Sequence, residues 1–320
     1  MDGIVVSIIC NTYNHEKYIA RALDSFLEQE TDFRYEILLH DDASTDNTKK
    51  VIDEYCKKNG KVIRPICQTE NQYSKNSAID LRFQFPRARG DFIAFCEGDD
   101  YWCDKRKLQK QVDALLKNPS INICTHASYI KKNGKTVGII SPNKFNSVIP
   151  VSEVIEGGGG FVATASIMIR RSVIDDISNF YSKYPFDYSL QIMGALNGGM
   201  LYLADYMSVY NILTENSWTM ACSKNRGLAI LWERKVLNML QALKEEFPQV
   251  TKYVNKAEQV ENAKLLFLED DYRGIIFNRK YFNKLSLRNK IIILLGAVFG
   301  KKCIENIRIL KKSIIAFLRR

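Results

Sequence analysis

The stretch DFIAFCEGDDYW, residues 91–102, places three acids directly after the apolar run 92–96. These acids are Glu97, Asp99 and Asp100. Like charges this close repel one another, and the end of an apolar strand is a poor place to leave them unpaired. A divalent cation between them would make the arrangement tolerable, and oxygen ligands suit Mg²⁺ or Mn²⁺. The alternative is that the acids cap a helix starting near Asp104 or form a solvated turn.

Short apolar runs alternate with helical patterns through the first half of the chain. Strands are predicted at 4–10, 35–42, 61–67, 91–97 and 121–127, with a further one at 161–171 and a helix from Asp187. Pro65 makes the third strand an edge or irregular one. Continuous apolar strands alternating with helices predict an α/β fold with a doubly wound, mostly parallel, Rossmann-like sheet.

Polar clusters follow three of the predicted strands, at 11–16, 40–48 and 97–102. Parallel sheets of this kind bind ligands beyond the carboxyl ends of their strands, so the clusters are expected to form one site. Asp41 and Asp42 stand at a strand tip, where a carboxylate can accept a hydrogen bond from a base or from ribose. Neither a dinucleotide fingerprint nor a P-loop occurs. A nucleotide would therefore be held through side chains and a metal.

The formal net charge of +10 is confined to the end of the chain. Residues 280–320 contain eleven Lys or Arg and one acid, which leaves 35 bases and 35 acids elsewhere. A nucleic-acid partner is therefore not expected. The eight cysteines include no CxxC pair, which disfavours zinc and favours a reducing, cytoplasmic setting. The N-terminus lacks the basic region of a signal peptide.

Several segments, in order, resemble the family 2 glycosyltransferases, which have the GT-A fold. They are VSIICNTYNHEKYIARALDSFLEQ (6–29), EILLHDDASTDNT (36–48), RGDFIAFCEGDDYWCDKRKLQKQVDAL (89–115) and acceptor-side segments between 161 and 218. The third looks like the DxD region of the family in an EGDD variant. The resemblance implies an inverting transfer of a sugar from a nucleoside diphosphate sugar, with a UDP-sugar favoured, to an acceptor hydroxyl. It also implies Mn²⁺ or Mg²⁺ as the cofactor.

The resemblance assigns roles to individual residues. The nucleotide sugar is expected at Asn11, Thr12, Tyr13, Asp41, Asp42, Glu97, Asp99 and Asp100, and the metal at Asp99 and Asp100. Asp187 occupies the position of the general base, a role compatible with capping its helix. Tyr101 and Trp102 are expected to pack in the core, whereas Trp218 is a candidate for contact with the acceptor sugar.

The sequence departs from the family pattern at three positions. Asn11 stands where the family usually has Pro, and Asn211 and Leu213 stand where many members have Arg and His. The last two changes remove a cation and a possible phosphate or metal contact. A non-catalytic nucleotide-sugar or glycan-binding protein of the same fold is therefore the alternative function. His40 and His126 are expected to pack at strand ends rather than to bind ligands.

The sequence predicts three regions along the chain. They are a GT-A domain at 1–222, with a nucleotide-sugar half at 1–127 and an acceptor half at 128–222, then a helical extension at 223–285 and a basic amphipathic tail at 286–320. The apolar run 291–299 is too short to span a bilayer. The apolar and basic stripes of the tail indicate a helix on an anionic membrane surface; packing on the protein or in a homodimer is the alternative. We therefore expect a cytoplasmic enzyme, peripheral on the cell membrane, that builds bacterial surface polysaccharide, capsule or lipopolysaccharide on a lipid-linked acceptor.

Overall fold

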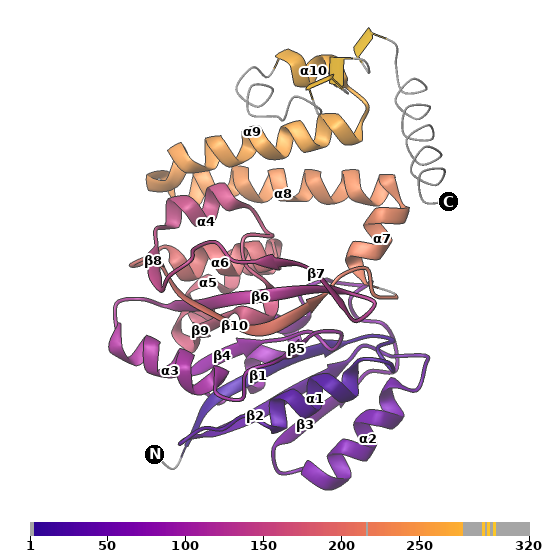
Figure 1. Cartoon of the computed structure of the whole chain (residues 1–320), viewed down its shortest axis with the longest axis vertical. Coiled ribbons are helices and arrows are strands. Elements are labelled where there is room, and N and C mark those ends of the chain that lie inside the picture. The colour runs from indigo at the N-terminus through magenta and orange to yellow at the C-terminus, as the bar shows by residue number, and fades with distance from the viewer. Residues whose placement is uncertain (1–2, 216, 278–289, 292, 295–296, 299–320) are drawn as a thin grey trace, which may run out of the picture. The chain divides into compact units, whose positions relative to one another are not determined.

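The computed structural model describes residues 3–215, 217–277, 290–291, 293–294 and 297–298 (Figure 1). The chain divides into two compact units, Met1–Ala221 and Cys222–Arg320. Most of the predicted tail, including its whole apolar stripe from Ile304 to Leu318, lies outside the described residues. No helix in the part of the chain that is described combines the length and apolarity needed to cross a membrane.

One mixed sheet runs through the first unit in the order β3-β2-β1-β4-β9-β6-β10-β5, with β7 paired to β6 and β8 paired to β10. The strands are β1 (Ile4–Thr12), β2 (Arg34–Asp41), β3 (Ile63–Cys67), β4 (Phe92–Phe95), β5 (Tyr101–Trp102), β6 (Ile123–Lys132), β7 (Lys135–Ile140), β8 (Ser147–Ile149), β9 (Met168–Arg170) and β10 (Met200–Asn211). The longest pairings, β1 with β2 and β6 with β10, are parallel, as are β2 with β3 and β1 with β4. The predicted α/β fold with a mostly parallel sheet is confirmed.

Helices and short helical turns connect these strands (Figure 1). They are α1 (Ile19–Leu27), α2 (Thr48–Asn59), η1 (Asp80–Gln84), η2 (Phe85–Arg87), α3 (Lys107–Lys117), α4 (Val151–Gly157), η3 (Thr164–Ser166), α5 (Arg171–Lys183), α6 (Asp187–Ala195) and α7 (Trp218–Lys224). Ile19, Leu23 and Phe26 recur at helical spacing on α1 and are fully buried against strand residues such as Ile8. The apolar periodicity thus places α1 on the sheet core, as the sequence pattern predicts.

The second unit is helical where it is described, as predicted. It contains α8 (Arg226–Glu246), η4 (Pro248–Val250), α9 (Thr251–Leu268) and α10 (Tyr272–Phe277). Asn225 caps α8, because its Oδ1 accepts a hydrogen bond from the Leu228 amide at 3.1 Å. The buried residues Met239 and Leu243 of α8 and Val254 of α9 belong to the apolar faces of this helix pair.

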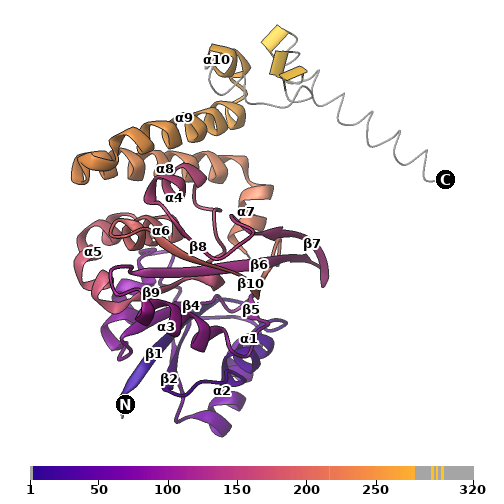
Figure 2. The same cartoon turned by 60° about the vertical axis from the view of Figure 1, so that its left-hand side comes forward.

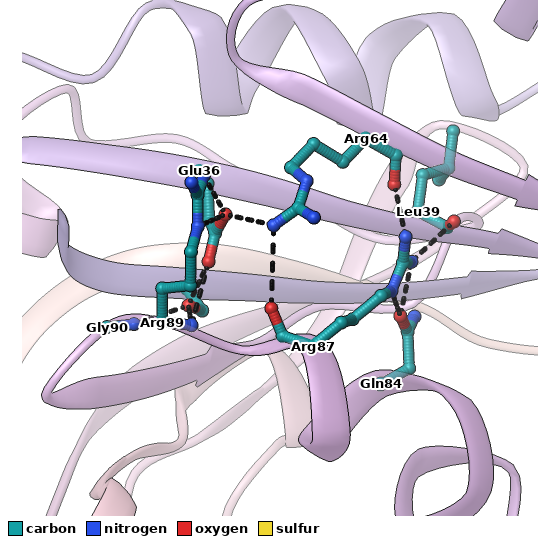
Figure 3. A network of polar contacts seen from close by, with 8 residues as sticks. Glu36, Leu39, Arg64, Gln84, Arg87, Arg89 and Gly90 are labelled. Carbon is teal, nitrogen blue, oxygen red and sulfur yellow. Dashed lines mark hydrogen bonds and ion pairs between the residues drawn. The ribbon is translucent and has the colours of Figure 1, made fainter.

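A buried carboxylate on β2 fixes the chain just before β4. Glu36 accepts hydrogen bonds from Ser7 Oγ at 2.8 Å, from Arg64 Nη1 at 2.9 Å and from both the amide and the guanidinium of Arg89 (Figure 3). Burial alone would raise the pKa of Glu36, but the donors from Arg89, Ser7 and Arg64 outweigh it and hold that pKa below its usual value. The segment that leads into β4 is thereby tied to β1, β2 and β3.

Arg87 continues this network toward the end of β1. Its guanidinium donates to the main-chain oxygens of Arg64 at 2.7 Å and Leu39 at 2.9 Å, and to Gln84 Oε1 at 2.6 Å (Figure 3). Gln84 in turn donates through Nε2 to Asn11 Oδ1 at 3.1 Å. The network therefore fixes the orientation of Asn11, one of the residues expected to contact the nucleotide sugar.

Candidate active site

The sheet brings the three predicted polar clusters together. Thr12 at the end of β1 pairs with Asp41 at the end of β2, and the Asp42 amide donates to the Thr12 carbonyl at 3.0 Å. On the other side of β1, the Gly98 amide donates to the carbonyl of Asn11 at 2.9 Å. The carboxyl ends of β1, β2 and β4 therefore form one edge, as expected for a ligand site in a parallel sheet.

Five carboxyl groups influence one another at this edge. They belong to Asp80, Glu97, Asp99, Asp100 and Asp187. Burial, followed by repulsion from the other acids, raises the pKa of Glu97 and that of Asp100 well above their usual values. Among the described residues, the basic side chain within ion-pair range of these acids is His15, whose Nε2 lies 4.0 Å from Asp99 Oδ2, and burial lowers the pKa of His15 and so favours its neutral form. The cluster therefore gathers acids with little compensating positive charge from the described residues, and the empty site favours keeping some of them protonated.

The end of β10 holds the EGDD loop in place. The Asn211 amide donates to Asp100 Oδ1 at 2.8 Å, and its side-chain Nδ2 donates to the Asp99 carbonyl at 2.6 Å. Thr214 Oγ1 donates to Asp99 Oδ2 at 2.6 Å, after a turn in which Leu213 has a φ of +58°. Asn211, which stands where many family members are expected to have Arg, therefore acts here as a donor to the acidic loop.

Asp99 and Asp100 each keep one oxygen without a donor. Asp99 Oδ1 and Asp100 Oδ2 accept no hydrogen bond from the residues that the structure describes. Each of these two oxygens could contribute to a cation site. No group of three or more His, Cys, Asp or Glu side chains in the described part of the chain forms a complete metal cage. A cation at this position would need further ligands from outside the protein.

Asp187 begins α6, as predicted, but the residue that caps this helix is Phe186. One carboxylate oxygen of Asp187, Oδ2, accepts a hydrogen bond from Thr164 Oγ1. The side chain of Asp187 is exposed at the surface. The protein atoms around its carboxylate nevertheless displace part of the water that would solvate the charge, and this desolvation raises the pKa of Asp187 above its usual value. The carboxylate is thus accessible to an incoming molecule and more basic than a free aspartate.

Asp80 and Tyr181 join the site, although the sequence pattern does not single them out. Asp80 Oδ1 accepts from Asn11 Nδ2 at 2.8 Å, and its Oδ2 accepts from the Tyr181 hydroxyl at 3.3 Å. Burial, with a further contribution from Asp187, raises the pKa of Asp80 to about 6. The one hint in the sequence is an acid at the start of DLRFQ, at the end of a loop without periodicity. The contacts link the end of β1 to α5.

The two aspartates at the carboxyl end of β2, Asp41 and Asp42, lie in different surroundings. Both oxygens of Asp42 accept main-chain hydrogen bonds, from the Gln72 amide at 2.7 Å and the Tyr73 amide at 2.9 Å. Asp41 accepts from the hydroxyl of Ser44, and both aspartates are buried. In this structure Asp42 therefore fixes the loop after β3.

Only glycine fits at the centre of the EGDD loop. A Cβ at Gly98 would lie 2.7 Å from Thr12 Oγ1 and 3.0 Å from His15 Nδ1. Both of these polar atoms are buried and have no hydrogen-bond partner in the described structure. The close approach of the EGDD loop to the end of β1 therefore depends on the missing side chain at position 98.

Several aromatic and histidine side chains near the site are structural. Trp102 is buried and donates through Nε1 to the Ala165 carbonyl at 2.9 Å, and Tyr101 is also buried, as predicted. His40 and His126 are fully buried, and burial lowers their pKa values to about 4 and about 3. Trp218 and Tyr13, in contrast, are exposed. Each of these last two exposes part of its ring at the surface.

The sequence matches the family model described as glycosyl transferase family 2 over residues 7–178. It is 33% identical over 240 residues to the uncharacterized protein Rv1520 of Mycobacterium tuberculosis, which covers 74% of this chain and 66% of the relative. It is 29% identical over 178 residues to WfgD of Escherichia coli, a UDP-Glc:alpha-D-GlcNAc-diphosphoundecaprenol beta-1,3-glucosyltransferase, covering 56% of this chain and 65% of WfgD. The matched region thus spans just under two thirds of the length of these relatives.

A solved structure has the same fold. The mannosyltransferase PcManGT from Pyrobaculum calidifontis, in complex with GDP-Man and Mn²⁺, aligns over 97% of this chain and 85% of its own, with a TM-score of 0.58 and 14% identity. This likeness confirms the GT-A fold that the sequence predicts. The family match covers more than half of the chain and includes the ends of β1, β2 and β4, where the acids gather, so this chain belongs to glycosyl transferase family 2.

Proposed function

We propose that this chain is an inverting glycosyltransferase that moves a sugar from a nucleoside diphosphate sugar to an acceptor hydroxyl with the help of Mn²⁺ or Mg²⁺. The observation that carries the proposal is the group of five mutually repelling acids at one edge of the sheet, three of them in the EGDD loop. A structural cap or a solvated turn does not require acids from three separate segments to meet in this way.

The carboxylates fit a hard divalent cation, which prefers oxygen ligands. Asp99 and Asp100 would hold it through the two oxygens that accept no hydrogen bond from the described residues. The incomplete cage agrees with a cation that takes its remaining ligands from the donor diphosphate and from water. When bound, the cation would neutralise charge on the leaving diphosphate. PcManGT, which has the same fold, is bound to GDP-Man and Mn²⁺.

The end of β1 is the proposed contact for the nucleoside. Tyr13 is exposed and can offer its ring to a base, and Asn11 is oriented by hydrogen bonds to both Asp80 and Gln84. Asp42 would meet the base through the loop that it fixes, at Gln72 and Tyr73. A rigid binding surface of this kind reduces the entropy that is lost when the donor binds.

Asp187 is the proposed general base. Thr164 fixes its Oδ2, so the other carboxylate oxygen can accept the proton of an acceptor hydroxyl. A catalytic base works best when its pKa lies near the working pH, and the raised pKa of Asp187 is a shift in that direction. Attack from the side of Asp187, with the diphosphate leaving on the opposite side, inverts the configuration at the anomeric carbon.

The acceptor is proposed to be a glycan on a lipid carrier. WfgD, by its name, transfers glucose from UDP-Glc to GlcNAc on diphosphoundecaprenol, which supports a UDP-sugar donor and a lipid-linked acceptor in surface polysaccharide synthesis. Trp218, exposed at the start of α7, is the proposed stacking contact for the acceptor sugar. A peripheral position on the cytoplasmic face of the membrane would bring the site to such an acceptor.

The test combines donor binding with transfer. UDP-, GDP-, CMP- and dTDP-sugars are titrated calorimetrically with and without Mn²⁺, and the variants are Asp99→Asn, Asp187→Asn and the control Asp91→Asn, whose side chain is 71% exposed. Asp99→Asn should lose metal-dependent donor binding. Asp187→Asn should bind donor normally but transfer roughly 10²–10⁴-fold more slowly. Wild-type protein that binds no donor with Mn²⁺ would refute the proposal.

One observation favours a second function, a non-catalytic donor-binding protein. Asn211 is engaged with the EGDD loop and supplies no charge where the resemblance implies a cation. Such a protein would bind the donor with Mn²⁺ yet transfer its sugar to no acceptor, and Asp187→Asn would leave every measured property unchanged. Hydrolysis or transfer that depends on Asp187 decides against it.

A further inference from the structure

The β6–β7 hairpin carries an apolar face with no covering element in the described structure. Val137 and Ile139 on β7 are 57% and 53% exposed, Lys135 precedes them at the exposed start of the strand, and a register shift opposite Ile130 and Lys131 interrupts the regular alternation of sides between them. Tyr129 on β6 pairs with Ile139, and Lys132 pairs with Lys135. We name these five residues the hairpin face. Figure 2 shows the hairpin projecting beyond the strands with which it pairs.

The hairpin lies in a segment of the sequence whose formally charged side chains are all positive. No Asp or Glu occurs between Asp113 and Glu153, whereas five lysines do: Lys117, Lys131, Lys132, Lys135 and Lys144. Lys131 donates to the Tyr101 hydroxyl at 3.0 Å and so serves the fold. Lys132 and Lys135 are exposed and form no ion pair with the described residues. The hairpin face therefore combines exposed apolar side chains with uncompensated positive charge.

The hairpin leaves the sheet beside the acidic cluster. β6 is parallel to β10, and Lys131 pairs with Asn211, the residue that donates to Asp99 and Asp100. The turn at Asn133 and Gly134, where φ is +49° and +76°, then sends β7 back along β6. A surface that contacted the hairpin face would thus lie at the same edge of the sheet as the candidate active site.

We propose that the hairpin face docks on an anionic membrane surface and holds the site at the level of a lipid-linked acceptor. Apolar side chains that enter the boundary between headgroups and acyl chains, together with lysines at the headgroups, are the physical basis of such binding. A second copy of the chain fits less well, because two surfaces that both carry Lys132 and Lys135 without an acid would repel one another. The contact uses residues within the first unit and is separate from the predicted tail.

Docking on a membrane requires no nucleotide-sugar donor. A result that contradicts docking can therefore be told apart from a result that contradicts sugar transfer. The full-length chain is sedimented with vesicles of phosphatidylcholine, with or without phosphatidylglycerol. The variants are Val137→Ser/Ile139→Ser and Lys132→Ala/Lys135→Ala, and the control is Leu116→Ser on α3, a residue that is 54% exposed. These positions lie on the surface, and unchanged thermal unfolding and donor binding would verify that each variant folds.

Binding to anionic vesicles should weaken about fivefold for each lysine removed. The apolar variant should lose at least as much affinity, and Leu116→Ser should bind like the wild type. Hydrogen exchange of residues 129–140 supplies a local readout when the tail keeps the protein on the vesicle. Slower exchange in this segment with anionic vesicles supports the proposal. Unchanged exchange, or a dimer that the apolar variant converts to monomers, overturns it.

Discussion

Replacement of Asp80 by asparagine should stabilise the protein above pH 6 and leave its stability almost unchanged near pH 4. Burial and the nearby Asp187 raise the pKa of Asp80 from its usual 3.8 to about 6. Between those values the folded protein keeps a proton that the unfolded chain has already lost. The unfolding free energy therefore falls as pH rises through this window, and the full penalty is present above pH 6.

The magnitude follows from the size of this shift. A difference of about two pKa units corresponds to roughly 3 kcal/mol, which is an upper estimate for the stability gained at pH 8. Asparagine retains an oxygen that can accept from Asn11 Nδ2, so the substitution removes the charge and keeps that contact. For a unit of this size, each kcal/mol raises the melting temperature by about 2–4 °C.

The assay is urea and thermal unfolding at pH 4 and pH 8, followed by tryptophan fluorescence, to which the buried Trp102 contributes. Asp91→Asn, at an exposed side chain, is the control and should change stability at neither pH. Asp80→Ala separates charge from hydrogen bonding, because it also removes the acceptor used by Asn11. Equal stability of Asp80→Asn and wild type at pH 8, or a larger gain at pH 4 than at pH 8, would refute the reasoning.

Two further predictions concern the EGDD loop and the tail. Gly98→Ala would force a Cβ to 2.7 Å from Thr12 Oγ1, so it should lower the unfolding free energy by about 1–3 kcal/mol and weaken donor binding. The matched control Gly160→Ala meets no atom within 4 Å and should unfold in urea like the wild type. Deletion of residues 286–320 should shift the protein from membrane toward supernatant on cell fractionation, with the hairpin face as the remaining membrane contact, and leave donor binding intact. An unchanged distribution would contradict the membrane interpretation of the tail.

The parts of the fold that the sequence predicts are those determined by local periodicity. The apolar runs that become β1, β2 and β4 are continuous because both faces of those strands are buried, as in parallel sheets. Pro65 lies in β3, which ends the sheet, because an edge strand tolerates the missing amide donor. The convergence of the polar clusters follows from this arrangement, so the acidic loop and its neighbours could be predicted.

The parts that the sequence does not predict depend on contacts between distant residues. The run 161–171 forms the turn η3 and the short strand β9 instead of one continuous strand. Trp102 Nε1 and Gln111 Nε2 donate to the carbonyls of Ala165 and Ser166, at 2.9 and 2.8 Å, and so satisfy groups that a neighbouring strand would otherwise bind. Such side-chain donors leave no trace in the local pattern of the turn.

Asp80 shows the same limit within the site. Its partners, Asn11 and Tyr181, are 69 and 101 residues away along the chain, and the loop before it has no periodicity. Tertiary packing alone brings this further acidic segment beside the EGDD loop and Asp187. The sequence could therefore indicate an acidic site but not its full negative charge.

The acid that Asp80 adds to the site affects how cation binding there would depend on pH. The raised pKa values of Asp80, Glu97 and Asp100 mean that the empty cluster retains protons that a free carboxyl would lose. A cation bound among these acids must displace such protons, so its affinity rises with pH. Such a cation would remove the repulsion that destabilises the ionised fold, and it would stabilise the protein most where the cluster is fully charged. Cation affinity, the number of protons released on cation binding and the stability of the protein should therefore all depend on how far the acids at the ends of β1, β2 and β4 are ionised.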